Sequence, residues 1–223
     1  MSEGLDNRRP LKTRSAGWAG ATARMLGRAG VRPNAISAAS VVFALTGAGL
    51  LVLSGRTDDV AARAALVVGA ALCIQLRLLA NMLDGMVAVE QGLGSPTGAI
   101  WNELPDRIAD ALFLAGAGYG AALAGQADGV WLGWLASVLA VLTAYVRELG
   151  RGLGFPADFS GPMAKPHRMF TLTVACLVAA AEPLWGWRGE ASLIALGVIA
   201  AGSLATVWRR TGRLAKLLNE RSE

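Results

Sequence analysis

The sequence predicts an all-α integral membrane protein, with six transmembrane helices preceded by an N-terminal interfacial amphipathic helix and with both termini in the cytoplasm. Hydrophobic residues make up 54% of the 223 residues and charged residues only 17%, which is too little charge to cover a soluble domain. Long stretches carry no Asp, Glu, Lys or Arg, and each can cross about 30 Å of hydrocarbon as a helix. Two cysteines and one histidine exclude a disulfide framework and any site that needs two imidazoles.

We expect a single domain over residues 1–223, beginning with a cytoplasmic leader and interfacial helix over residues 1–30. The segment 17–30 is typical of a helix that lies in the membrane surface. There Trp18 and Met25 can face lipid while basic side chains reach the phosphates.

The six predicted spans are helices rather than strands, because backbone groups in lipid must be satisfied within the segment. Four of them are free of charge and two are interrupted by polar residues. The charge-free spans are residues 33–55, 111–127, 129–146 and 191–208, and the interrupted spans are residues 64–83 and 169–187.

The distribution of basic residues predicts the orientation. Lys and Arg concentrate before residue 33, between residues 147 and 168, and in a basic tail over residues 209–223. Six spans place these three regions on one side, and few basic residues lie on the other. Since positive residues stay in the cytoplasm, we expect both termini there, in a multi-pass protein of the plasma membrane.

Polar side chains within spans are costly and usually mark a functional site. They cluster at the cytoplasmic ends of the second and third spans, which the short connection 91–97 makes antiparallel neighbours. Helical spacing places them on two facing stripes. The set consists of Asn81 and Asp84 on one helix and Asn102, Asp106 and Asp110 on the next. Oxygen ligands without His or Cys favour Mg²⁺, Mn²⁺ or Ca²⁺.

The same residues resemble the signature of the CDP-alcohol phosphotransferases, D-x2-D-G-x2-A-R-x8-G-x3-D-x3-D. The spacing matches throughout. The matching positions are Asn81, Asp84, Gly85, Ala88, Val89, Gly98, Asn102 and Asp106. The six-helix layout with a preceding amphipathic helix is also similar to this family, and the resemblance implies a homodimer.

The resemblance implies a transferase of phospholipid synthesis. The family moves a substituted phosphoryl group from a CDP-linked donor to an alcohol and releases CMP, so the donor is CDP-diacylglycerol or another CDP-alcohol. Four carboxylates hold two divalent cations, Mg²⁺ or Mn²⁺, and the position of Asp106 also serves as general base. Asp84, Gly85, Ala88 and Gly98 match the region where the nucleotide enters. Membrane lipids are further partners, and no nucleic acid is expected.

The chain departs from the signature at three positions, where Asn81 and Asn102 replace aspartates and Val89 replaces the arginine. Two divalent ions would therefore be under-neutralised by the remaining carboxylates. Asp110, one turn beyond Asp106, and Glu103 are candidate replacements. Glu103 points about 100° away from Asn102 on a helix, so its use requires the helix to begin there, with Asn102 as N-cap. The predicted metal ligands are Asn81, Asp84, Asn102, Glu103, Asp106 and Asp110.

Basic residues near this pocket suggest that it binds an anionic lipid or a phosphorylated small alcohol, such as glycerol phosphate or inositol phosphate. They are Arg77, Arg147, Lys165 and Arg168. Topology alone also accounts for basic residues on this side. Two alternatives to an enzyme remain. One is a catalytically impaired homologue that binds nucleotide-lipid or a partner enzyme. The other is a transporter, which the apolar third span beyond Asp110 disfavours.

Overall fold

The computed structural model describes residues 17–90 and 97–222, and every regular element in these ranges is a helix. The predicted all-α class is therefore confirmed, while most of the leader and nearly all of the 91–97 connection lie outside the described residues. The elements are α1 (Gly17–Arg28), α2 (Pro33–Arg56), α3 (Val60–Glu90), α4 (Gly98–Leu123), α5 (Gly129–Gly152), α6 (Lys165–Ala181), the 3₁₀ turn η2 (Glu182–Trp185) and α7 (Glu190–Ser222).

Five of the described helices are long and apolar enough to cross a membrane, which agrees with an integral membrane protein. They are α2, α3, α5, α6 with η2, and α7. The sixth predicted span, residues 111–127, corresponds to α4, which is 26 residues long. Composition alone does not single out α4, because Asp106, Arg107 and Asp110 lie in its first half.

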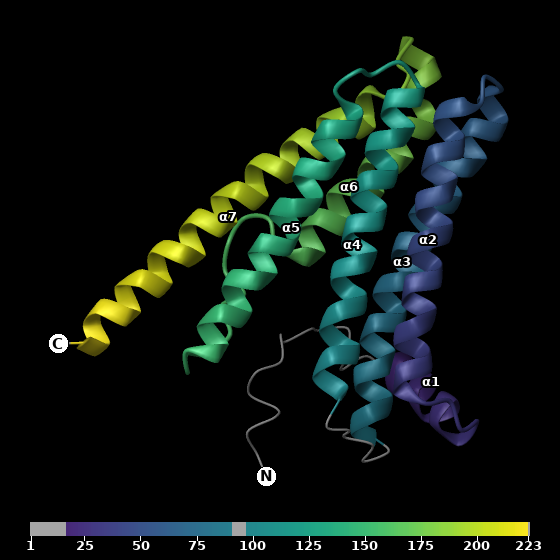
Figure 1. The fold of residues 1–223 in the computed structure, drawn as a ribbon. Helices are drawn as coiled ribbons and strands as arrows, with labels where there is room; N and C mark the ends of the chain where they lie inside the picture. The colour runs from purple at the N-terminus through teal and green to yellow at the C-terminus, as the bar shows by residue number, and fades with distance from the viewer. Residues whose placement is uncertain (1–16, 91–96, 223) are drawn as a thin grey trace.

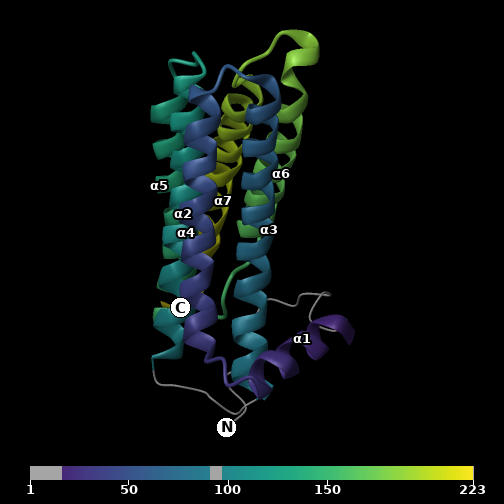
Figure 2. The same ribbon diagram turned by 90° about the vertical axis from the view of Figure 1, so that its right-hand side faces the viewer.

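The long helices form one bundle, and α1 crosses its lower end at a steep angle (Figures 1 and 2). α2 packs along both α3 and α4, α4 packs on α5, and α7 contacts α4, α5 and α6. α3 and α4 contact one another over only a short stretch. Toward the lower end α5 and α7 diverge from α2, α3 and α4 (Figure 1).

Small residues set the closest helix contacts. A Cβ on Gly116 of α4 would lie 2.8 Å from the Cα of Ala48 on α2. A Cβ on Gly118 would lie 2.9 Å from the Cα of Gly133 on α5. Membrane helices gain van der Waals contact from such small residues, since lipid offers no hydrophobic drive between them.

Two helix boundaries differ from the sequence predictions, and one agrees. α1 lies within the helix predicted over residues 17–30, and it packs through Ala19 and Ala23 against α3. The basic tail does not begin a separate segment, because α7 continues without a break to Ser222. The prediction of Asn102 as an N-cap is wrong: α4 begins at Gly98, so Asn102 lies within the helix and is exposed.

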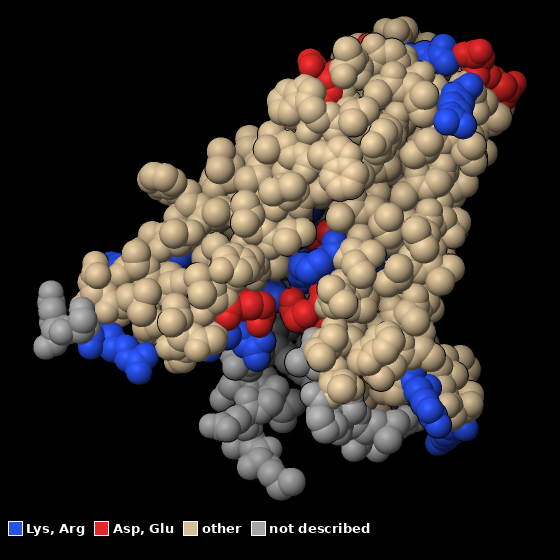
Figure 3. Space-filling model, viewed as in Figure 1, with Lys and Arg blue, Asp and Glu red and all other residues tan. Residues whose placement is uncertain are grey.

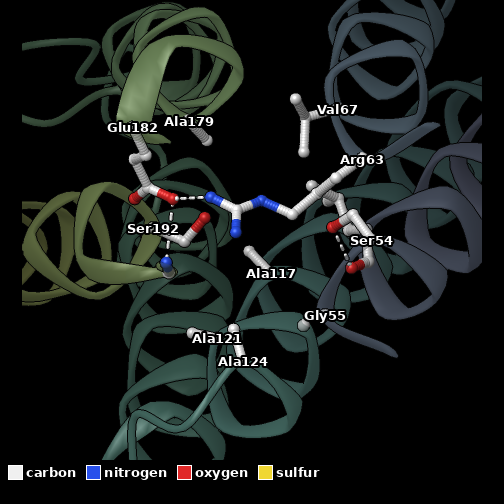
Figure 4. A pocket seen from close by; sticks show the side chains of 13 residues that line it. Ser54, Gly55, Arg63, Val67, Ala117, Ala121, Ala124, Ala179, Glu182 and Ser192 are labelled. Atoms are coloured by element: carbon white, nitrogen blue, oxygen red, sulfur yellow. Dashed lines mark hydrogen bonds and ion pairs between the residues drawn. The ribbon is translucent and has the colours of Figure 1, made fainter. Parts of the chain in front are cut away.

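A polar pocket at the opposite end of the bundle has a structural role (Figure 4). Glu182, buried at the end of α6, accepts a hydrogen bond from Arg63 Nη2 at 2.7 Å. It also accepts from the backbone N–H groups of Gly189 and Ala191, both at 2.8 Å. Glu182 thereby satisfies donors at the start of α7, where a negative charge is favourable.

Candidate functional site

Charged side chains meet where α3, α4 and α6 approach one another, well away from the Glu182 end. Figure 3 shows acidic and basic atoms gathered in a recess on a face that is otherwise largely uncharged, at the level where the helices diverge. The residues of this cluster come from helices that are distant in sequence, and long side chains bridge α3 and α4.

Asp84 on α3 is only 4% exposed and keeps one oxygen unpaired. Its Oδ2 accepts a hydrogen bond of 2.6 Å from Ser37 Oγ on α2. Its Oδ1 is buried and has no hydrogen-bond partner among the described residues. Ser37, which lies four residues after the first residue of α2, was not among the predicted site residues. A buried carboxylate oxygen without a donor is costly unless a ligand meets it.

Asp106 on α4 binds basic side chains through both of its oxygens. Oδ1 accepts from Arg77 Nη2 at 3.1 Å. Oδ2 accepts a hydrogen bond from Nζ of Lys165, which is the first residue of α6. The same Nζ also donates to Asn81 Oδ1 at 2.7 Å. Lys165 thus links the first and fourth positions of the signature, one on α3 and one on α4.

Asp110 lies deeper and pairs with two buried arginines. Its Oδ1 accepts from Arg77 Nη2 at 2.8 Å and its Oδ2 from Arg168 Nη2 at 2.8 Å. The side chains of Arg77 and Arg168 are 0% and 1% exposed. Arg168 also donates to the carbonyl of Met163 and to Thr143 Oγ1, and neither partner was predicted from the sequence. Both arginines therefore bind α4 inside the bundle, and they do not lie at the rim of the recess.

A second set of ion pairs forms a rim of the recess. Glu103 pairs with Arg147 Nη2 at 2.6 Å and with Arg107 at 3.2 Å. Arg147 also pairs with Glu148 at 2.8 Å, and its guanidinium lies 5.4 Å from the ring centre of Phe159. Unlike Arg77 and Arg168, the side chains of Arg147 and Lys165 remain partly exposed.

The remaining predicted residues lie around this cluster. Gly85 and Ala88 are half-buried on α3, beyond Asp84, and Gly98 is the first residue of α4. Asn102 is exposed, and no described side-chain hydrogen bond joins it to Asp84 or Asp106. Of the six predicted metal ligands, Asn81 and Asp106 are brought together through Lys165.

The described residues do not fit a pair of divalent cations. They contain no group of three or more His, Cys, Asp or Glu side chains arranged to hold a metal ion. The oxygens of Asp106 and Asp110 and the amide oxygen of Asn81 already bind basic groups. The unpaired Oδ1 of Asp84 is compatible with one cation at that residue.

The fold and site together define a helical membrane protein with a cluster of charged side chains in a recess of its bundle (Figure 3), and comparisons with known proteins agree with this class. No family model matches the chain. A phosphatidylinositol phosphate synthase of Mycolicibacterium smegmatis is 26% identical over 186 residues, which cover 82% of this chain and 77% of that protein.

Crystal structures of Mycobacterium tuberculosis phosphatidylinositol phosphate synthase have a similar fold at 22% sequence identity. The form with CDP-DAG bound gives a TM-score of 0.74 and covers 89% of this chain and 94% of that chain. The complex with manganese and citrate gives a TM-score of 0.73, with 88% of each chain covered. These relatives confirm the resemblance to the CDP-alcohol phosphotransferases that the signature predicts.

Proposed function

We propose that the chain is a membrane-embedded transferase that moves a phosphatidyl group from CDP-diacylglycerol to a small alcohol and releases CMP, in phospholipid synthesis. One observation carries the proposal. The signature positions of Asn81, Asp84 and Asp106, matched at fixed spacing, lie around a single charged cluster in a fold similar to that of phosphatidylinositol phosphate synthase.

The reactive groups follow from this arrangement. Asp106 is the general base that takes the proton of the acceptor hydroxyl, and this requires its Oδ2 to exchange the Lys165 ammonium for the hydroxyl. Lys165 and Arg147, which are partly exposed, then bind phosphate oxygens of the acceptor or of the lipid. The acceptor is therefore a phosphorylated alcohol, such as inositol phosphate or glycerol phosphate.

A divalent ion, Mg²⁺ or Mn²⁺, completes the proposed site, with Asp84 as the residue that would hold it through Oδ1. When bound, such an ion neutralises charge on the diphosphate of the donor as CMP leaves. Ser37 orients Asp84 by donating to its other oxygen.

The proposal includes the topology. α4 crosses the membrane as a sixth span, so both termini and the charged cluster face the cytoplasm, in the plasma membrane. The chain acts as one domain and forms a homodimer through its membrane helices.

A second function has specific support. Asn81 and Asn102 are neutral, and both oxygens of Asp106 bind basic groups. The same geometry therefore suits a homologue that binds nucleotide-lipid, or a partner enzyme, without turnover.

CMP release distinguishes the two functions. Purified protein in mixed micelles with CDP-diacylglycerol and Mn²⁺ would be tested with inositol phosphate, inositol, glycerol phosphate and glycerol, which are two matched pairs differing in the phosphate. We expect CMP release with a phosphorylated acceptor, and a loss of ~100-fold or more in Asp106→Asn, since general bases contribute at least that factor. Binding of CDP-diacylglycerol with no release above the Asp106→Asn level for any acceptor would establish the second function instead.

A further inference from the structure

Lys165 lies where the signature would lead one to expect a metal ion. Its Nζ binds the amide oxygen of Asn81 on α3 and the carboxylate of Asp106 on α4, and these residues occupy the first and last acidic positions of the signature. The ammonium thus joins the two helices as a shared cation would. α6 begins at Lys165, with Pro166 in its first turn, so the backbone fixes where this side chain starts.

Basic side chains already pair with two of the three carboxylates of the inner cluster, which are Asp84, Asp106 and Asp110. Arg77, Lys165 and Arg168 pair with Asp106 and Asp110, and Arg107 lies 3.7 Å from Asp106 Oδ2. Asp84 forms no ion pair among the described residues, and its Oδ1 has no hydrogen-bond partner there. A divalent ion therefore meets a free carboxylate oxygen at Asp84, whereas a second ion would have to displace the cations that Asp106 and Asp110 bind.

The asparagine at position 81 is consistent with this pairing. An aspartate at position 81 would add a negative charge beside Lys165, whereas the amide of Asn81 accepts its hydrogen bond without one. Asparagine at position 81 therefore matches a site in which the single charge of the Lys165 ammonium replaces the double charge of a divalent cation. Asn102 is exposed and makes no described side-chain hydrogen bond with Asp84 or Asp106.

We infer that the Lys165 ammonium substitutes for one of two divalent cations, so that the chain binds a single divalent ion, at Asp84. The inference rests on the proposed function, because it concerns the cation content of the same site.

The test is the number of Mn²⁺ ions bound per chain, measured by electron paramagnetic resonance titration of purified protein in detergent, without substrate. Ions that remain in Asp84→Ala are subtracted as adventitious. We expect one Mn²⁺ per wild-type chain and one in Lys165→Arg, which keeps the positive charge. The double variant Asn81→Asp/Lys165→Gln, which restores a carboxylate and removes the ammonium, is expected to bind two.

Two ions bound by the wild type, or one ion bound by the double variant, overturns the inference. Thermal unfolding of each variant in detergent identifies any that fails to fold, and the wild-type and Lys165→Arg counts then still decide. Failure of the proposed function gives a different pattern. One Mn²⁺ per chain without CMP release would refute the transferase function and support the inference about Lys165. Two Mn²⁺ per chain with CMP release would support the transferase function and refute the inference about Lys165.

Discussion

The carboxylate of Asp110 neutralises two arginines that water does not reach. Arg77 and Arg168 each pair with one of its oxygens at 2.8 Å. We therefore expect Asp110→Asn to lower the free energy of unfolding by ~3 kcal/mol, because it leaves two buried cations under-compensated. Thermal unfolding in detergent without metal measures this loss. The exposed Asn102 on the same helix provides the control, and Asn102→Ala is expected to change stability little.

A role for Asp110 as a metal ligand predicts a different result. In that case Asp110→Asn would weaken Mn²⁺ binding while leaving the metal-free protein as stable as the wild type. That outcome would contradict the ion-pair role described here.

The identities of the polar residues were readable from the sequence, but their pairing was not. Helical periodicity correctly predicts that Asp106 and Asp110 share a face of α4. It does not predict that Arg77 reaches both of them, or that Lys165 bridges Asn81 and Asp106, because those contacts depend on how α3, α4 and α6 approach in space. Ser37 was missed for the same reason, since its partner Asp84 lies 47 residues away in the chain.

The contact between α2 and α4 depends on Gly116, because a side chain at this position would collide with the backbone of α2. A Cβ there would lie 2.8 Å from the Cα of Ala48, so Gly116→Ala forces the two helices apart. Overpacking of this kind typically costs 1–3 kcal/mol, and we expect a loss of that size in thermal unfolding. Gly49→Ala on α2 is the matched control, because a Cβ at Gly49 meets nothing within 4 Å. Equal stability of the two variants would contradict close packing at this contact.

The loop between α5 and α6 is attached to α7 through Asp158. Its Oδ1 accepts from the backbone N–H of Ser160 at 2.8 Å, and Arg213 lies 3.4 Å away. Although burial raises the pKa of Asp158, the hydrogen bonds from Ser160 and the charges of Arg213 and Arg210 outweigh it and lower the pKa below its ordinary value. Because the folded-state pKa is depressed, this stabilisation is complete above the unfolded pKa of about 4 and disappears as the pH falls through the folded value.

We therefore expect Asp158→Asn to unfold at a lower temperature than the wild type at pH 7, with the difference shrinking below about pH 4. Thermal unfolding of both proteins across this range provides the measurement. Comparing the two cancels the titration of other carboxylates. A difference that stays constant as the pH falls would mean that the charge of Asp158 does not hold the loop.

At the scale of the whole molecule, composition predicts the helical membrane class because lipid allows few alternatives. The ends of the helices are less predictable. α4 begins well before the charge-free stretch and α7 continues far beyond its own, since a helix does not stop where hydrophobicity stops. Charge-free length is therefore a poor guide to helix boundaries.

The number of spans itself depends on α4, whose charges are paired within the bundle. Asp106 and Asp110 pair with Arg77, Arg168 and Lys165, and such pairing lowers the cost of placing these charges in a bilayer. It also runs the length of the bundle between the α1 end and the η2 end (Figure 1). We expect α4 to cross the membrane, giving six spans with both termini in the cytoplasm.

Reporter fusions in bacteria test this topology. A fluorescent protein at either terminus should fluoresce, and alkaline phosphatase should be inactive at the termini but active when inserted after Asp58. Five spans would place the termini on opposite sides, so an active phosphatase at one terminus alone would show that α4 does not cross.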